Sequence, residues 1–139
     1  MQRCVLGTVV GGITLFVLGY VIYGIVFAQF FAANAGSATG VDRQVFVFWA
    51  LGLGQLVWGG LLTLLLGWAR VSTVGGGLKV GAIVGLLSAL GIDLTLYGLT
   101  NISNLTATLV DPVLNMVLFA CAGAVITLAV GKNLQPRMQ

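Results

Sequence analysis

The chain has 139 residues, of which 59% are hydrophobic and only 6% are charged, whereas soluble domains have roughly 45–50% apolar and about 25% charged residues. Six Lys and Arg residues and three Asp residues are too few to cover a water-exposed surface. These numbers exclude a soluble globular domain. We therefore expect an all-α integral membrane protein, because a bilayer is crossed by apolar helices of about 20 residues.

The same composition provides few of the residue types that catalysis and metal binding require. The chain contains no His and no Glu, and its two cysteines, Cys4 and Cys121, lie far apart. Metal sites need His, Cys or clustered carboxylates, and the three Asp residues are scattered along the sequence. We predict that the protein is not an enzyme and has no metal site, no cofactor and no nucleic-acid partner, and that it is surrounded by membrane lipid.

Long uncharged runs predict a four-helix bundle in a single transmembrane domain, residues 1–139. The four helices are expected near residues 5–31, 45–68, 78–100 and 112–131. The polar residues 101–108 have the composition of a loop. Asp111 is expected to cap the fourth helix, with Pro112 at its first position, where no N–H is needed.

The positive charges predict the orientation of these helices. Five of the six cations lie near the two ends of the chain or around the connection between the second and third helices: Arg3, Arg70, Lys79, Lys132 and Arg137. The other two connections hold Arg43 alone. Because Lys and Arg favour cytoplasmic loops, both termini are predicted to be cytoplasmic.

A weak internal repeat relates the two halves of the chain. Gly59, Thr63 and Gly67 recur 64 residues later as Gly123, Thr127 and Gly131. The first helix contains Val10-Gly11-x-Ile13, and the third contains Val80-Gly81-x-Ile83. Each half begins on the same side of the membrane. The repeat therefore suggests two tandem, parallel helical hairpins, unlike the inverted repeats of many transporters.

Small residues mark the predicted contact faces of the helices, because close backbone approach drives helix association in lipid. The residues expected on these faces are Gly7, Gly11, Gly81, Gly85, Ser88, Ala120 and Ala124. Two interpretations remain open. The faces either hold the four helices of one chain together, or they contact a second copy of the chain or a larger membrane complex.

Asp93 is the most informative polar residue, because it is the one charge-capable side chain well inside a predicted span, and intramembrane carboxylates suggest function. The polar residues expected to accompany it are Tyr20, Tyr23, Tyr97, Asn115 and Gln55. Burial without a cationic neighbour favours the protonated carboxyl group. Three interpretations of Asp93 remain open. It belongs to a neutral hydrogen-bond network, it forms a site that couples to protons or cations, or it lies exposed to lipid or water near the outer edge of the membrane.

An aromatic stripe runs along the first helix through Phe16, Tyr20, Tyr23 and Phe27 at steps of three and four residues. Such stripes commonly pack against other helices or lipid. Gly19 and Gly24 lie beside the two tyrosines, so the alternative is a groove that takes a lipid tail or a pigment.

The motifs Leu18-Gly19-x-x-x-Tyr23 and Gly81-x-x-x-Gly85, with Thr100-Asn101 after the latter, resemble those of small four-helix bacterial membrane proteins in families of unknown function. This resemblance implies a bacterial inner membrane. The sequence as a whole predicts a non-enzymatic accessory or structural subunit that packs through its glycine-rich faces. The alternative is a small proton- or cation-coupled carrier or channel-like protein that uses Asp93.

Overall fold

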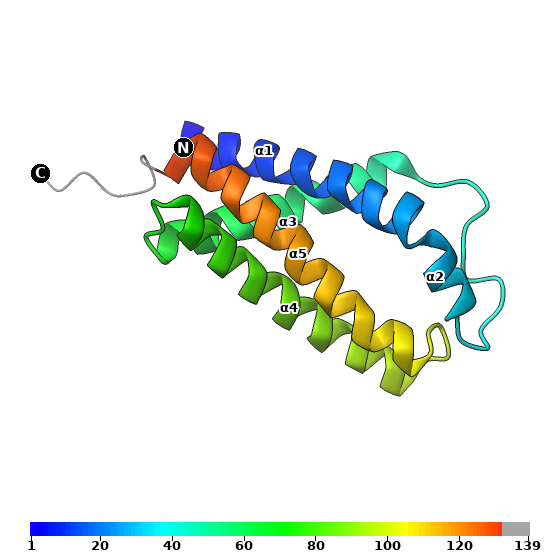
Figure 1. Ribbon diagram of the computed structural model, residues 1–139. Helices are drawn as coiled ribbons and strands as arrows, with labels where there is room; N and C mark the ends of the chain where they lie inside the picture. The colour runs from blue at the N-terminus through cyan, green and yellow to red at the C-terminus, as the bar shows by residue number, and fades with distance from the viewer. Residues whose placement is uncertain (132–139) are drawn as a thin grey trace, which may run out of the picture.

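The computed structural model describes residues 1–131 and shows an all-α bundle (Figure 1). Its helices are α1 (Gln2–Gly19), the π-helix η1 (Tyr20–Val26), α2 (Ala28–Ala33), α3 (Phe48–Trp68), α4 (Val74–Leu99) and α5 (Leu105–Val130). Lys132 and Arg137, which contributed to the predicted orientation, lie outside the described residues.

Four segments within the described residues are long and apolar enough to cross a membrane. They are Gln2–Val26, which joins α1 to η1, and the helices α3, α4 and α5. Few of their side chains are buried inside the bundle, and large apolar residues cover its outside. The chain is therefore a multi-pass membrane protein with a four-helix bundle, as its composition predicts.

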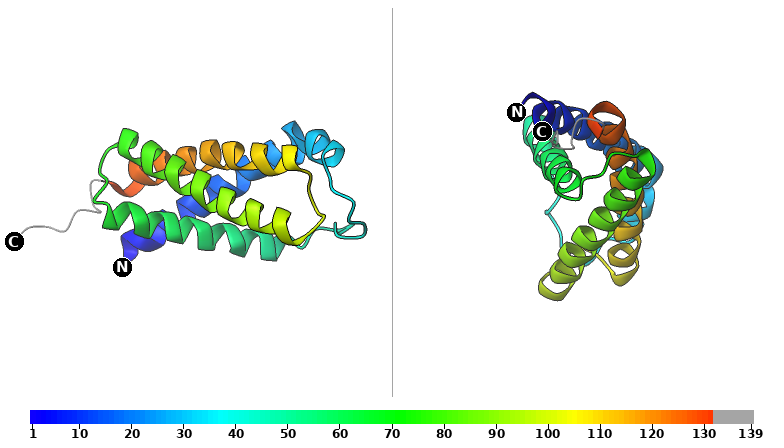
Figure 2. Two further views of the ribbon diagram at one scale, coloured as in Figure 1. Left: turned by 90° about the horizontal axis from the view of Figure 1, so that it is seen from below. Right: turned by 90° about the vertical axis from the view of Figure 1, so that its left-hand side faces the viewer.

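The four spans pack as two neighbouring hairpins joined through one central contact. α1 packs along α3, α4 packs along α5, and α1 also contacts α5, whereas α3 makes few contacts with α4 or α5. The two hairpins diverge towards one end of the bundle (Figures 1 and 2). The fully buried side chains Leu15, Leu62, Leu66 and Ile126 form the centre of the core.

Equivalent residues make equivalent contacts in the two hairpins. Gly7 lies against the side chain of Thr63, and Gly77 lies against Thr127. Both threonines donate a hydrogen bond to the carbonyl oxygen four residues earlier, that of Gly59 at 2.8 Å and that of Gly123 at 2.7 Å. These contacts support the predicted tandem repeat, because each hairpin closes at the same glycine and threonine positions.

The predicted start of the last helix was wrong. α5 begins at Leu105, where the Asn104 side chain accepts a hydrogen bond of 2.9 Å from the backbone N–H of Ala107. Pro112 lies inside the helix and is buried, and Asp111 is not its cap. The polar residues before Asp111 have the composition of a loop. They are nevertheless compatible with a helix, because the Thr108 hydroxyl donates a hydrogen bond to the Asn104 carbonyl oxygen at 2.9 Å. Membrane helices tolerate an internal proline of this kind.

Two further boundaries differ from the prediction. α4 begins at Val74 because the Thr73 side chain accepts a hydrogen bond from the N–H of Gly76, so part of the expected loop is helical. The first span is not a regular α-helix to residue 31, since it becomes a π-helix from Tyr20 to Val26 and breaks at Phe27. Hydropathy is uniform through this region and does not distinguish the two helix types.

A loop clasp, formed by residues 34–38 and 101–104, joins the two hairpins at the end where they diverge. The backbone N–H groups of Gly36 and Ala38 donate to the carbonyl oxygens of Ile102 and Asn101, at 2.8 and 2.9 Å. The Asn104 side chain donates to Asn34 Oδ1 at 3.0 Å. The clasp therefore ties the loop after α2 to the start of α5.

Replacing Asn104 with Ala is expected to lower the free energy of unfolding by about 1–2 kcal/mol, because it removes both the cap of α5 and the bond to Asn34. Thermal or detergent unfolding of the purified protein measures this change. Asn104→Asp keeps a capping oxygen and is expected to recover part of the loss. Asn101→Ala is the matched control, since position 101 contributes a backbone carbonyl to the clasp. An equal loss in that control contradicts the prediction.

Candidate functional site

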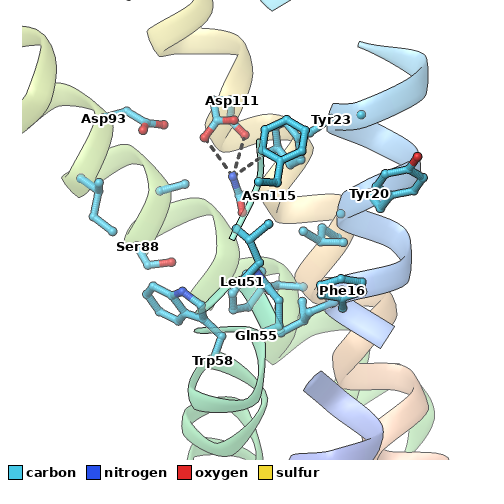
Figure 3. Close-up of a pocket in the computed structure, with 18 of the residues that line it drawn as sticks. Phe16, Tyr20, Tyr23, Leu51, Gln55, Trp58, Ser88, Asp93, Asp111 and Asn115 are labelled. Atoms are coloured by element: carbon cyan, nitrogen blue, oxygen red, sulfur yellow. Dashed lines mark hydrogen bonds between the residues drawn. The ribbon is translucent and has the colours of Figure 1, made fainter. Parts of the chain in front are cut away.

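A cavity of about 570 Å³ lies between the two hairpins, towards the clasp end of the bundle. All four spans line it. Its wall is mainly apolar and aromatic and includes Leu15 and Phe16 from α1, Trp58 from α3, and Leu118 and Phe119 from α5 (Figure 3). The rings of Trp58 and Phe119 meet edge to face, with centroids 5.7 Å apart. The volume is within the range of roughly 300–1,000 Å³ found for small-molecule sites.

A polar cluster at one side of the cavity joins the first span to α5. The Asn115 side-chain amide donates to Tyr23 Oη at 2.7 Å and to Asp111 Oδ2 at 2.9 Å. The Tyr23 ring packs against Phe31 of α2, with centroids 5.4 Å apart. Asn115 therefore fixes the positions of a phenol and a carboxylate that come from different spans.

Asp93 extends from α4 into the same cavity, towards Asp111 (Figure 3). The two carboxyl groups are close enough to interact electrostatically. Asp93 Oδ2 is buried and has no hydrogen-bond partner among residues 1–131. A buried polar oxygen without a partner is uncommon and needs an explanation, and here it lies beside an open volume.

No Lys or Arg side chain is among the residues that line the cavity. The other polar lining side chains are Gln55, Ser88, Tyr20 and the indole of Trp58. The Ser88 hydroxyl is already used, because it donates to the Val84 carbonyl oxygen at 2.6 Å. Ionisation of Asp93 or Asp111 thus gives the cavity a negative charge that no lining cation neutralises.

Most of the polar residues predicted to accompany Asp93 line this one cavity. Tyr20, Tyr23, Gln55 and Asn115 are lining residues, although the hydroxyl of Tyr20 points away from Asn115 (Figure 3). Tyr97 is not among them. It is exposed one turn beyond Asp93, nearer the end of α4, and so the expected i, i+4 pairing does not bring it into the site.

Asp111 is the site residue that the sequence analysis missed. It was assigned to the cap of a helix predicted to start at Pro112, whereas the helix begins seven residues earlier, at Leu105. The available signal was the spacing of Asp111 and Asn115, since residues four apart on one helix are neighbours.

The small residues predicted on contact faces lie mainly inside the bundle. Gly7 and Gly11 meet α3 and α5, and Gly81 and Gly85 meet the backbone of α5. Ala120 lies beside Gly81, and Ala124 is half-buried on α5. Ser88 lines the cavity.

The aromatic side of the first span also borders the cavity, as the groove alternative predicts. Phe16, Gly19, Tyr20, Tyr23 and Gly24 all line it. The last three belong to the π-helix η1, and π-helical turns often lie at functional sites.

The arrangement is a cavity with two carboxyl groups between the four spans of an all-α bundle. It offers hydrogen-bond acceptors and aromatic faces. No group of three or more His, Cys or Asp residues that could hold a metal ion occurs within residues 1–131. Comparisons with protein families, with curated proteins and with solved structures find no match to this chain.

Proposed function

We propose that this protein is a small carrier that couples to protons or cations through the carboxyl groups of Asp93 and Asp111. The observation that supports this function best is the cavity itself. It brings together carboxyl groups from two different helices at a place lined by apolar side chains. Intramembrane carboxylates in a cavity are typical of proton relays and ion pathways.

Charge favours a proton or a cation over an anion as the coupled species. Two ionised carboxylates repel each other in a medium of low dielectric constant. A proton or a cation bound between them relieves this repulsion. Apart from the two Asp residues, the titratable lining groups are the phenols of Tyr20 and Tyr23. The residues contributed by α3 include Gln55 and Trp58, which do not titrate.

The alternative role, an accessory subunit that contacts itself or a larger complex, has less support. It was inferred from the glycine-rich faces, and those at Gly7, Gly11, Gly81 and Gly85 pack within the chain. A partner therefore has to use other surfaces of the bundle.

The proposed location is a bacterial inner membrane, with both termini in the cytoplasm. Arg3, Arg70 and Lys79 belong to the end of the bundle that holds the N-terminus and the connection between α3 and α4 (Figure 1). Arg43 belongs to the loop at the opposite end. This distribution supports the proposed positive-inside orientation, in which the cavity lies in the outer half of the bilayer. Asp93 is then about 9 Å from the end of α4, at about 1.5 Å per residue.

Asp93→Asn is expected to abolish ion flux in proteoliposomes, because an amide can keep hydrogen bonds but cannot carry a proton or bind a cation by charge. The measurement uses entrapped dyes that report internal pH, Na⁺ or K⁺ while the corresponding ion gradient is imposed. Wild-type protein is expected to give a flux under at least one gradient. Asp42→Asn is the matched control, because Asp42 is exposed in the loop before α3.

Absence of flux in wild-type protein under all three gradients contradicts the carrier function. Unchanged flux in Asp93→Asn contradicts the role of Asp93. The folding of each variant is checked by its elution volume and its unfolding transition, so that a loss of flux is attributed to a folded protein.

A further inference from the structure

The size and the lining of the cavity point to a ligand larger than a metal ion. A volume of about 570 Å³ accommodates an organic molecule. Bound Na⁺ or Ca²⁺ needs several oxygen ligands that converge on one point, whereas the lining here is mainly apolar and aromatic. An apolar body with a small polar part matches this lining.

The two carboxyl groups and the lack of Lys or Arg in the lining favour a positively charged polar part. Asp111 already accepts a hydrogen bond from Asn115 at 2.9 Å, but Asp93 Oδ2 is buried without a partner among the described residues. A cationic nitrogen placed there neutralises the ionised carboxylate by charge, whether it is quaternary or protonated, and a protonated nitrogen also donates a hydrogen bond to this oxygen. The rings of Phe16, Tyr23, Trp58 and Phe119 line the same volume, and aromatic faces attract organic cations.

Access to the cavity is available from the side of the bundle. Three residues on its border expose large apolar surfaces, namely Tyr20 at 56%, Phe46 at 62% and Phe48 at 58%. α3 makes few contacts with α4, so the wall between the hairpins is not closed by helix packing. A ligand dissolved in the bilayer therefore reaches the cavity without crossing the loop clasp.

From these observations we infer that the cavity binds a monovalent organic cation with an aromatic or branched apolar body, whose charged nitrogen lies against Asp93. This inference rests on the proposed carrier function and names its substrate class. The ligand combines a quaternary or protonated nitrogen with enough apolar surface to dissolve in the bilayer.

Trp58 provides the readout for a binding test, because it is a lining residue and Trp49 and Trp68 are exposed at the two ends of α3. The experiment uses the full chain with Trp49→Phe and Trp68→Phe, in lipid nanodiscs. Benzyltrimethylammonium is the probe, and its neutral carbon isostere neopentylbenzene and the anion benzenesulfonate are the controls. Saturable change of Trp58 fluorescence is expected with the cation alone.

Asp93→Asn is expected to weaken binding of benzyltrimethylammonium about ten- to a hundredfold, which is the range for losing one interaction with a charged group. Asp42→Asn is expected to leave the affinity unchanged. The comparison of the cation with its neutral isostere uses the Trp58-only protein with Asp93 intact, so it remains decisive even where Asp93→Asn does not fold.

The outcomes separate this inference from the carrier function. Equal binding of the cation and its neutral isostere overturns the inference and identifies a lipid-tail groove. Absence of cation binding together with Asp93-dependent ion flux also overturns it, while the carrier function stands. Saturable cation binding without any flux supports the inference and contradicts the carrier function.

Discussion

Replacing Gly81 with Leu is expected to lower the free energy of unfolding by about 3 kcal/mol or more and to separate α4 from α5. A β-carbon at position 81 would lie 3.0 Å from the Cα atom of Ala120 and closer still to the carbonyl group of Phe119. Overpacking typically costs about 1–3 kcal/mol. A cost at the upper end of this range is expected at position 81, because the new side chain meets the backbone of α5, which cannot rotate away as a side chain can.

The measurement is reversible unfolding in mixed micelles with increasing SDS, followed by circular dichroism or tryptophan fluorescence. Gly91→Leu is the matched control, because position 91 is on the same helix and has no neighbouring atom within 4 Å. It is expected to be neutral or slightly stabilising, since Leu favours the helix by roughly 1 kcal/mol over Gly. A comparable loss of stability in both variants contradicts the assigned contact between α4 and α5.

Replacing Asn115 with Leu is the second substitution with a large expected effect. It removes the donor that bonds Tyr23 Oη at 2.7 Å and Asp111 Oδ2 at 2.9 Å. Each buried polar group left without a partner costs about 1–3 kcal/mol. We expect a loss of about 2–4 kcal/mol, because two acceptors lose their partner, and a weaker connection between the first span and α5.

A double-mutant cycle with Tyr23→Phe tests this network directly. Tyr23→Phe keeps the ring that packs on Phe31 and removes the hydroxyl that Asn115 contacts. We expect a coupling energy of about 1 kcal/mol or more between the two sites, since residues in one hydrogen-bond network do not behave additively. Additive losses of stability show that Asn115 acts without Tyr23, and they refute the network as drawn in Figure 3.

The helix termini are the part of the fold that the sequence predicted least well. The last helix was placed at Pro112 because proline suits a first helical turn, yet its cap is Asn104. Both residues carry a start signal, and in the structure Asn104 also donates a hydrogen bond to Asn34, 70 residues away. A local pattern does not contain that information.

The candidate site was predicted in part for a similar reason. Position along each span follows from residue number at about 1.5 Å per residue, so Tyr23 and Asn115 were expected to accompany Asp93, and all three line the cavity. The rotation of each helix about its own axis and the distance between two helices do not follow from residue number in this way. The sequence therefore did not distinguish Tyr97, which is exposed, from Asp111, which lines the cavity.

The sequence by itself determined that this is a multi-pass membrane protein with four spans, because an excess of apolar residues and a lack of charge leave no other stable environment for the chain. It also indicated the glycine positions at which the hairpins close. Only the tertiary structure decided that the hairpins diverge, that η1 interrupts the first span, and that a cavity lies between them. These features depend on how side chains of distant helices fit together, and such contacts are specified jointly by residues that no local pattern relates.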